Sequence, residues 1–220
     1  MKTLRMNLRT FSFVIFAVAL LFAGCEKDND VMPDARLVYE ENFDGNSGWR
    51  TANEENYKAY EADGKYVQVK LYSDGFYNYG FYKPVFSGAE KKQIVEYTVR
   101  IKEGTGGVNF ILNADQHKET VISLSANQYF KIFQYSYQEN RTVEIVDWTE
   151  NKLINVTQQS AVKMELENET LNIYVNGKKL YQWNSSGMPT LDYFGLGISV
   201  WDGSTSTIVE LDKIRAYAVD

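Results

Sequence analysis

Three carboxylates at regular spacing are the first side chains in this chain whose types could do chemistry. Glu144, Asp147 and Glu150 form a Glu-x-x-Asp-x-x-Glu pattern. Two carboxylates can serve as nucleophile and general acid when they flank one bond about 5–5.5 Å apart. In a regular strand Glu144 and Glu150 share a face and Asp147 points to the other, unless a bulge shifts the alternation. We interpret the segment as a solvated strand edge, so the sequence favours a protein that is not an enzyme, without excluding one.

Aromatic and amide side chains form a second candidate site. In segments 108–114 and 121–125 the even-numbered residues are apolar and are expected to face the core, so the odd-numbered ones face outward on a concave side. The same alternation in 129–137 and 195–201 places aromatic rings and a serine hydroxyl on this concave side, where Ser123 and Lys131 also lie. Rings stack on sugars, and amides and hydroxyls bond sugar hydroxyls. The predicted ligand-binding residues are Trp201, Tyr135, Tyr137, Phe133, Asn109, Asn113 and Ser199.

That interpretation has an alternative, because aromatic side chains also fill cross-strand positions in any sheet. We expect the segment 76–82 to be an aromatic loop. It could form one wall of the site, be buried, or face a partner protein. The single His117 lies in a polar turn and is expected to be an exposed loop residue. One Cys and one His exclude a disulfide scaffold and make a multi-His zinc site improbable.

The N-terminal residues have the pattern of a targeting segment. Three basic residues precede an apolar run over 11–22, which is too short to span a bilayer. The run ends in Leu-Phe-Ala-Gly-Cys, which resembles the lipobox of bacterial lipoproteins. We therefore expect a signal peptide over 1–24, lipidation at Cys25, and a flexible acidic tether over 25–36. The alternative is an ordinary signal peptide with a chance Cys. The acidic residues after Cys25 favour an outer-membrane, cell-surface location.

The net charge of the chain limits the classes of molecule that it could bind. The chain has 23 Lys and Arg against 29 Asp and Glu, a net charge of −6. Removing 1–24 takes away three basic residues and no acidic one, which leaves −9. A chain this acidic is a poor partner for nucleic acid or anionic lipid, and neutral glycans fit it better.

The elements that must position these residues are strands. Period-2 alternation between turn signals predicts about a dozen strands over 37–220, and no long segment has a clean helical period. Asn176-Gly177, Asp63-Gly64 and Asp202-Gly203 are hairpin signals. Because each strand has one apolar side, we expect an all-β, two-sheet antiparallel jelly-roll sandwich. The predicted strands are 65–71, 93–102, 108–114, 121–125, 129–137, 143–148, 161–167, 170–175, 179–183, 195–201 and 207–219.

Four ordered segments carry a family resemblance. They are an opening Glu-Asn-Phe-Asp-Gly followed by Gly-Trp at 41–49, an Asp-Gly hairpin at 61–66, an Asn-Gly hairpin at 171–180, and a closing pair at 193–217. Together they resemble the concanavalin A-like lectin/glucanase superfamily, which includes laminin-G-like jelly rolls. The resemblance implies the sandwich fold, and it leaves lectins, glucanases, sugar-modifying enzymes and adhesive modules open.

The resemblance also implies particular residues. Glucanases of this superfamily carry a Glu-x-Asp-x-Glu strand, from which the spacing at 144–150 departs. Many hold a structural calcium ion, and the ligands that match here are the Asp212 carboxylate, the Gly64 carbonyl and a backbone carbonyl near Glu41. The alternative for Asp212 is a strand cap or a pairing with Lys213 or Arg215.

Three functions follow from these observations. The first is a surface lipoprotein that binds glycan within an outer-membrane polysaccharide-uptake system. The second is an accessory lipoprotein of an outer-membrane transporter assembly, with its aromatic face buried against a transporter or a neighbouring lipoprotein. The third and weakest is a glycosidase-like enzyme.

Overall fold

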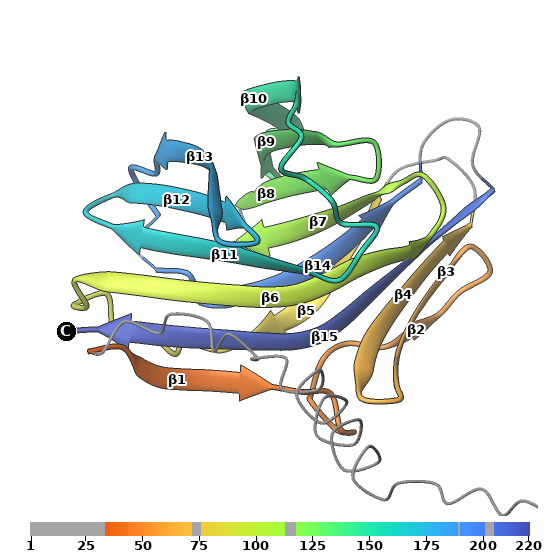
Figure 1. Ribbon diagram of the computed structural model, residues 1–220, viewed down its shortest axis with the longest axis horizontal. Helices are drawn as coiled ribbons and strands as arrows, with labels where there is room; N and C mark the ends of the chain where they lie inside the picture. The colour runs from red at the N-terminus through yellow and green to blue at the C-terminus, as the bar shows by residue number, and fades with distance from the viewer. Residues whose placement is uncertain (1–33, 72–75, 113–117, 189, 201–204) are drawn as a thin grey trace, which may run out of the picture. The chain divides into compact units, whose positions relative to one another are not determined.

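Alternating apolar and polar residues build strands throughout the part of the chain that the structure describes. The computed structural model describes residues 34–71, 76–112, 118–188, 190–200 and 205–220, which contain fifteen strands and no helix (Figure 1). Among these residues, no helix is available that is long and apolar enough to cross a membrane. They belong to one unit, Asp34–Asp220. The predicted all-β architecture of two antiparallel sheets is confirmed.

Nine strands form the first sheet: eight follow the order β13-β12-β11-β6-β15-β4-β3-β2, and the ninth, β1, pairs with β15. The last strand, β15, is long enough to pair with β6 along one edge and with both β4 and β1 along the other. The strands are β1 (Arg36–Glu41), β2 (Ala52–Asn53), β3 (Tyr57–Ala62), β4 (Lys65–Leu71), β6 (Lys92–Glu103), β11 (Ser160–Glu167), β12 (Thr170–Val175), β13 (Lys178–Asn184) and β15 (Ser206–Val219).

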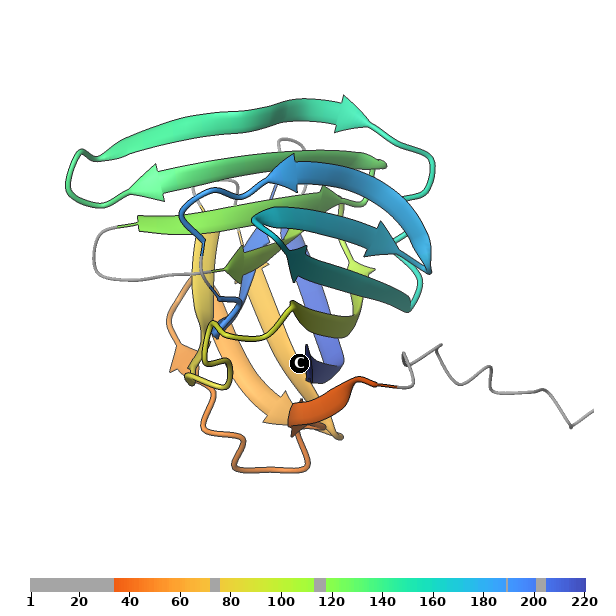
Figure 2. The same cartoon turned by 90° about the vertical axis from the view of Figure 1, so that its left-hand side faces the viewer.

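Six strands form the second sheet, in the order β10-β9-β8-β7-β14-β5. Strand β10 is one edge of it and lies at the top of Figure 2. The strands are β5 (Phe76–Tyr82), β7 (Gly107–Leu112), β8 (Lys118–Ser125), β9 (Tyr129–Ser136), β10 (Arg141–Glu150) and β14 (Tyr193–Ser199).

The segment 76–82, expected to be a loop, is instead the edge strand β5. It pairs with β14 along its whole length, with Gly80 directly opposite Gly195. A Cβ added at Gly80 would lie 2.6 Å from the Gly195 Cα, so only glycine allows the two backbones to approach this closely. The paired glycines let β5 lie close against β14 at this point.

The core lies between the two sheets. Val108, Phe110 and Leu112 of β7 face it, as their alternation predicted. The rings of Tyr97 in β6 and Phe110 in β7 meet edge-on across the interface, with centroids 4.9 Å apart. Burial raises the pKa of Tyr97 far above its ordinary value. This packing fixes which residues of the second sheet face away from the core.

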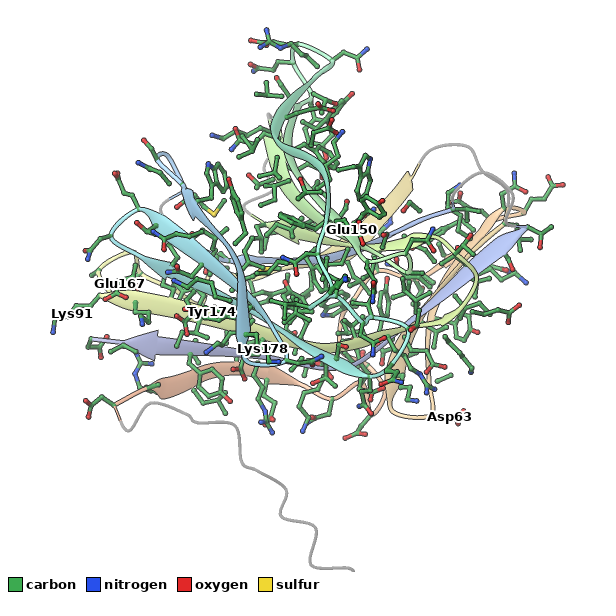
Figure 3. The ribbon with its side chains drawn as sticks, turned by 45° about the horizontal axis from the view of Figure 1, so that its top comes forward. Asp63, Lys91, Glu150, Glu167, Tyr174 and Lys178 are labelled. Carbon is green, nitrogen blue, oxygen red and sulfur yellow. The ribbon has the colours of Figure 1, made fainter. Side chains whose placement is uncertain are left out.

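Two predicted turns have the backbone that their residues suggest. Asn176 and Gly177 have φ of 50° and 75°, which is the type I′ signature, and they connect β12 to β13. Asp63 and Gly64, with φ of 53° and 67°, connect β3 to β4, and Asp63 is labelled in Figure 3. Asp202 and Gly203 lie outside the described residues.

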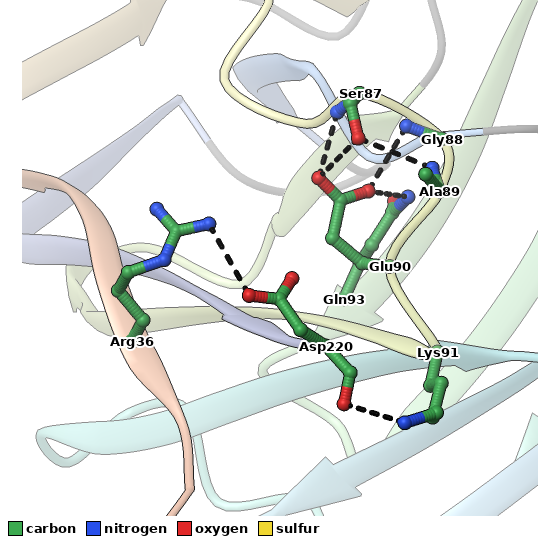
Figure 4. Close-up of polar contacts among 8 residues, drawn as sticks. All are labelled: Arg36, Ser87, Gly88, Ala89, Glu90, Lys91, Gln93 and Asp220. Carbon is green, nitrogen blue, oxygen red and sulfur yellow. Dashed lines mark hydrogen bonds and ion pairs between the residues drawn. The ribbon is translucent and has the colours of Figure 1, made fainter.

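A hydrogen-bonded turn closes the connection between β5 and β6 (Figure 4). The Glu90 carboxylate accepts hydrogen bonds from the Ser87 amide and hydroxyl, both at 2.8 Å, and from the Gly88 amide at 2.9 Å. Burial alone would raise the pKa of Glu90, but the bonds from Ser87 and Gly88 lower it to about 2. Next to it, the Lys91 ammonium donates to the Asp220 carbonyl at 2.8 Å and so ties down the end of β15.

Candidate functional site

The side of the six-stranded sheet that faces away from the core, here called the outer face, carries a hollow of about 370 Å³. Strands β7, β8, β9, β10 and β14 all contribute to it. Its lining brings together amide, hydroxyl, aromatic and charged side chains. The lining residues are Asn109, Ser123, Lys131, Phe133, Thr142, Glu144, Trp148, Ser199 and Val200.

The floor of the hollow is a buried polar pair. Asn109 and Ser123 are cross-strand neighbours on β7 and β8, and both are buried. The Ser123 hydroxyl donates to the Asn109 side-chain carbonyl at 2.6 Å, which holds the amide in one orientation. An oriented amide on a sheet is a preorganised group for a polar ligand.

The wall of the hollow is the irregular edge strand β10. Its register against β9 shifts twice, between Glu144 and Val146 and between Val146 and Thr149. These bulges put Asp147 on the same side as Glu144, which a regular strand would not do. The Lys131 ammonium consequently pairs with the Glu144 carboxylate and lies 3.7 Å from the Asp147 carboxylate.

Trp148 completes this wall. Its ring centroid lies 5.9 Å from the Lys131 ammonium, and its amide donates to the Asp147 carboxylate at 2.7 Å. The residue is 40% exposed, so part of its ring can contact a ligand. Trp148 was not among the predicted ligand-binding residues, although it lies inside the carboxylate segment 144–150.

The hollow collects three of the predicted ligand-binding residues, Asn109, Phe133 and Ser199. Tyr135 and Tyr137 also lie on the outer face but outside the hollow, where their rings meet edge-on with centroids 5.1 Å apart. Trp201 and Asn113 lie outside the described residues, as does His117.

Tyr135 and Tyr137 are held by neighbours instead. Tyr135 packs with Tyr193 over an apolar cluster of Ile111, Val121 and Phe133. The Tyr137 hydroxyl donates to the buried carboxylate of Glu119 at 2.7 Å. Burial and this carboxylate together raise the pKa of Tyr137 well above its ordinary value. Apolar contacts therefore dominate this end of the outer face.

Two carboxylates of the outer face, Glu144 and Asp147, lie close together because both pair with the Lys131 ammonium, whereas Glu119 lies far from them. On the described parts of β7, β8, β9 and β14, Glu119 is the only carboxylate at an outward position. It lies two strands and two residues away from Glu144, a Cα separation of about 12 Å. Glu119 bends toward Tyr137 and Glu144 toward Lys131, in opposite directions along β9. Hydrolysis by a carboxylate pair needs separations of about 5–9.5 Å.

The predicted calcium ligands lie on the other sheet and have other partners. The Asp212 carboxylate, at a bulge in β15, accepts a hydrogen bond from Gln159 and lies 3.6 Å from the Lys65 ammonium. The Glu41 carboxylate accepts from the Phe43 amide at 2.7 Å.

The third predicted ligand, Gly64, lies near Asp44 and near the Asn42 carbonyl, a backbone carbonyl close to Glu41. A Cβ added at Gly64 would lie 3.7 Å from the Asp44 carboxylate. Among the residues that the structure describes, no three Asp, Glu, His or Cys side chains gather as a metal site. In this structure Asp212 pairs with the Lys65 ammonium, and the calcium ion stays a prediction.

Comparison with known proteins shows which solved structures share this fold. No protein-family model and no curated protein matches the chain. A structure from work on endo-acting O-glycanases of the human gut microbiota is 14% identical, with a TM-score of 0.55, over 84% of this chain and all of that one. The laminarinase catalytic domain of Thermotoga petrophila is 12% identical, with a TM-score of 0.54, over 84% of this chain and 98% of that one. The β-glucanase of Bacillus licheniformis is 10% identical, with a TM-score of 0.55, over 83% of this chain and 97% of that one. At such identities the likeness shows the fold alone, and that fold is the concanavalin A-like jelly roll.

Proposed function

We propose that this protein binds glycan at the hollow on its outer face. One observation carries the proposal: the hollow combines an exposed Trp148 ring with an oriented Asn109 amide and with hydroxyl side chains. Aromatic rings stack on the apolar faces of sugars, while amides and hydroxyls bond sugar hydroxyls. A volume of about 370 Å³ falls within the range of about 300–1,000 Å³ that small-ligand sites occupy.

Known structures with this fold support a carbohydrate ligand. They include proteins whose names are laminarinase and β-glucanase, and one studied with endo-acting O-glycanases. Binding suits the described outer face better than cleavage for two reasons. Glu119 and Glu144 turn away from each other. The closer pair, Glu144 and Asp147, shares the Lys131 ammonium and is 51% and 76% exposed, so neither side chain has the burial that a catalytic acid needs. The proposal is therefore a binding protein.

We further propose that the chain is a lipoprotein of the outer membrane, exposed at the cell surface and anchored at Cys25. The support is the apolar run over 11–22 and the Leu-Phe-Ala-Gly-Cys segment that follows it. In that setting the protein would present glycan to a polysaccharide-uptake system, beside an outer-membrane transporter or a neighbouring lipoprotein.

A glycan array tests the binding site. The full-length protein in detergent is screened first, and the best glycan is then titrated by calorimetry against variants. Trp148→Ala and Asn109→Ala should each weaken binding by about tenfold, since each removes a stacking ring or an oriented amide. Tyr60→Ala is the matched control, because Tyr60 is also 40% exposed but lies on the other sheet.

Two results would overturn the proposal. One is an array on which the wild-type protein binds no glycan at all. The other is a bound glycan whose affinity is the same for the wild type, Trp148→Ala and Asn109→Ala. In the second case a transporter that co-purifies with the protein would favour the accessory role.

A further inference from the structure

We infer that the hollow selects glycans without carboxylate or sulfate groups, because Lys131, the one lysine among its described lining residues, is neutralised by two carboxylates of the bulged strand. The inference rests on the proposed function and adds the chemical class of the ligand. It depends on the surroundings of Lys131, on the net charge that results, and on the uncharged groups that remain.

Lys131 is enclosed by its neighbours. Its side chain is only 15% exposed, whereas its partners Glu144 and Asp147 are 51% and 76% exposed. The ammonium contacts one carboxylate, lies 3.7 Å from the other, and faces the Trp148 ring at 5.9 Å. A ligand that enters the hollow thus meets the two carboxylates before it meets the ammonium.

The charges in and beside the hollow disfavour an anionic ligand. Among the described lining residues Lys131 contributes one positive charge and Glu144 one negative charge, and the rest are uncharged. Asp147, which lies beside the hollow at 3.7 Å from Lys131, adds a second negative charge. An anionic sugar must displace Glu144 from Lys131 and then tolerate both carboxylates nearby. Like charges placed side by side at a binding surface are unfavourable and suppress the wrong partner.

The bulges of β10 create this arrangement. Without the register shifts on either side of Val146, Asp147 would point to the opposite face and Lys131 would keep a single partner. The hydrogen bond from the Trp148 amide to Asp147 fixes that carboxylate beside the ring. The same bulged segment therefore supplies both the stacking ring and the second negative charge.

The groups that remain for the ligand are uncharged. The Asn109–Ser123 pair forms the floor, and the hydroxyl side chains of Thr142 and Ser199 also line the hollow. Such groups bond sugar hydroxyls without requiring a charge on the ligand. Neutral hexose units match this set.

Matched glycan pairs test the inference. The array includes neutral and acidic oligosaccharides, among them β-1,4-mannohexaose and the β-1,4-mannuronate hexamer, which differ only in the carboxylate at each C6. The wild type should bind neutral members at least about tenfold more tightly than their acidic partners at low salt. Its affinity for neutral members should not change when salt is raised, because no ion pair forms with the ligand.

The double variant Glu144→Gln/Asp147→Asn should release Lys131 and raise the affinity for acidic members by about tenfold, and high salt should remove that gain. Both side chains are well exposed, and a melting curve checks that the variant folds. Glu54→Gln/Glu55→Gln is the control, since it makes the same charge change at exposed positions just before β3.

The outcomes separate the two proposals. A wild type that binds acidic glycans as tightly as neutral ones overturns the inference and leaves glycan binding intact. An unchanged preference in the double variant also overturns it, because the two carboxylates then do not set the preference. A wild type that binds no glycan overturns the proposed function and the inference together.

Discussion

Glu210 lies among three cations on the nine-stranded sheet, and its replacement should cost stability in a way that depends on pH. The side chain in β15 is 4% exposed. Its carboxylate lies 3.2 Å from Lys65, 2.5 Å from Arg100 and 2.7 Å from Lys102. Burial alone would raise the pKa of Glu210, but the hydrogen bonds from Lys102, Arg100 and Lys65 lower it to about 2.

The size of the effect follows from that pKa. The ordinary value is 4.5 and the folded value is about 2, and each pKa unit corresponds to about 1.4 kcal/mol. The charged Glu210 thus stabilises the fold by about 3 kcal/mol near neutral pH. Because the folded pKa is lowered, this contribution is present above the unfolded pKa and is lost as the pH falls through about 2. Near pH 3 about 1.4 kcal/mol of it should remain.

Urea denaturation of Glu210→Gln and wild type checks this expectation. The difference in unfolding free energy should be about 3 kcal/mol near pH 7 and about half of that near pH 3. Glu167→Gln is the control, because Glu167 is 45% exposed and pairs with Lys92 at 3.1 Å on the same sheet, so its loss should cost less than about 1 kcal/mol. If the Glu210→Gln difference is equal at the two pH values, the loss comes from packing and the electrostatic reasoning is refuted.

Three further predictions concern other parts of the chain. Cys25→Ala should move the protein from the membrane fraction to the soluble fraction, and full membrane retention of that variant would contradict lipidation. The predicted calcium ion requires that millimolar calcium raise the melting temperature of the wild type and not of Asp212→Ala. An unchanged wild type would remove the ion and leave Lys65 as the partner of Asp212. Gly195→Ala should lower the unfolding free energy by about 1–3 kcal/mol in urea, because the new Cβ would lie 2.7 Å from the Ile111 Cβ and 2.4 Å from the Tyr193 ring. Gly177→Ala is its comparison, since an added Cβ there meets nothing within 4 Å and the cost comes only from its positive φ.

The sandwich could be predicted from the sequence because its signals are local. The alternation in 108–112 identifies the inward side of β7, and Asn176-Gly177 identifies a hairpin without any knowledge of the rest of the chain. The same alternation placed Asn109, Phe133 and Ser199 on one face, and all three line the hollow.

The features of the site that the sequence did not predict depend on how neighbouring strands pair and pack. The bulges that turn Asp147 toward Lys131 belong to the pairing of β10 with β9, which the spacing within 144–150 does not reveal. Tyr135 lies outside the hollow because Ile111 and Val121 also point outward and need an aromatic cover. Ile111 in β7 and Val121 in β8 are apolar residues at outward positions, and the sequence signalled through them that part of the face is apolar.

The bulged edge strand has a consequence for how copies of the protein meet. Strand β10 is ten residues long and pairs only with β9, so its free edge presents backbone groups that another chain could extend into a fibril. Its two bulges interrupt the regular row of those groups. A second β10 laid alongside it would also bring Glu144, Asp147 and Glu150 close to the same carboxylates of its copy. The irregularity that shapes the hollow thus also protects the sheet against edge-to-edge aggregation.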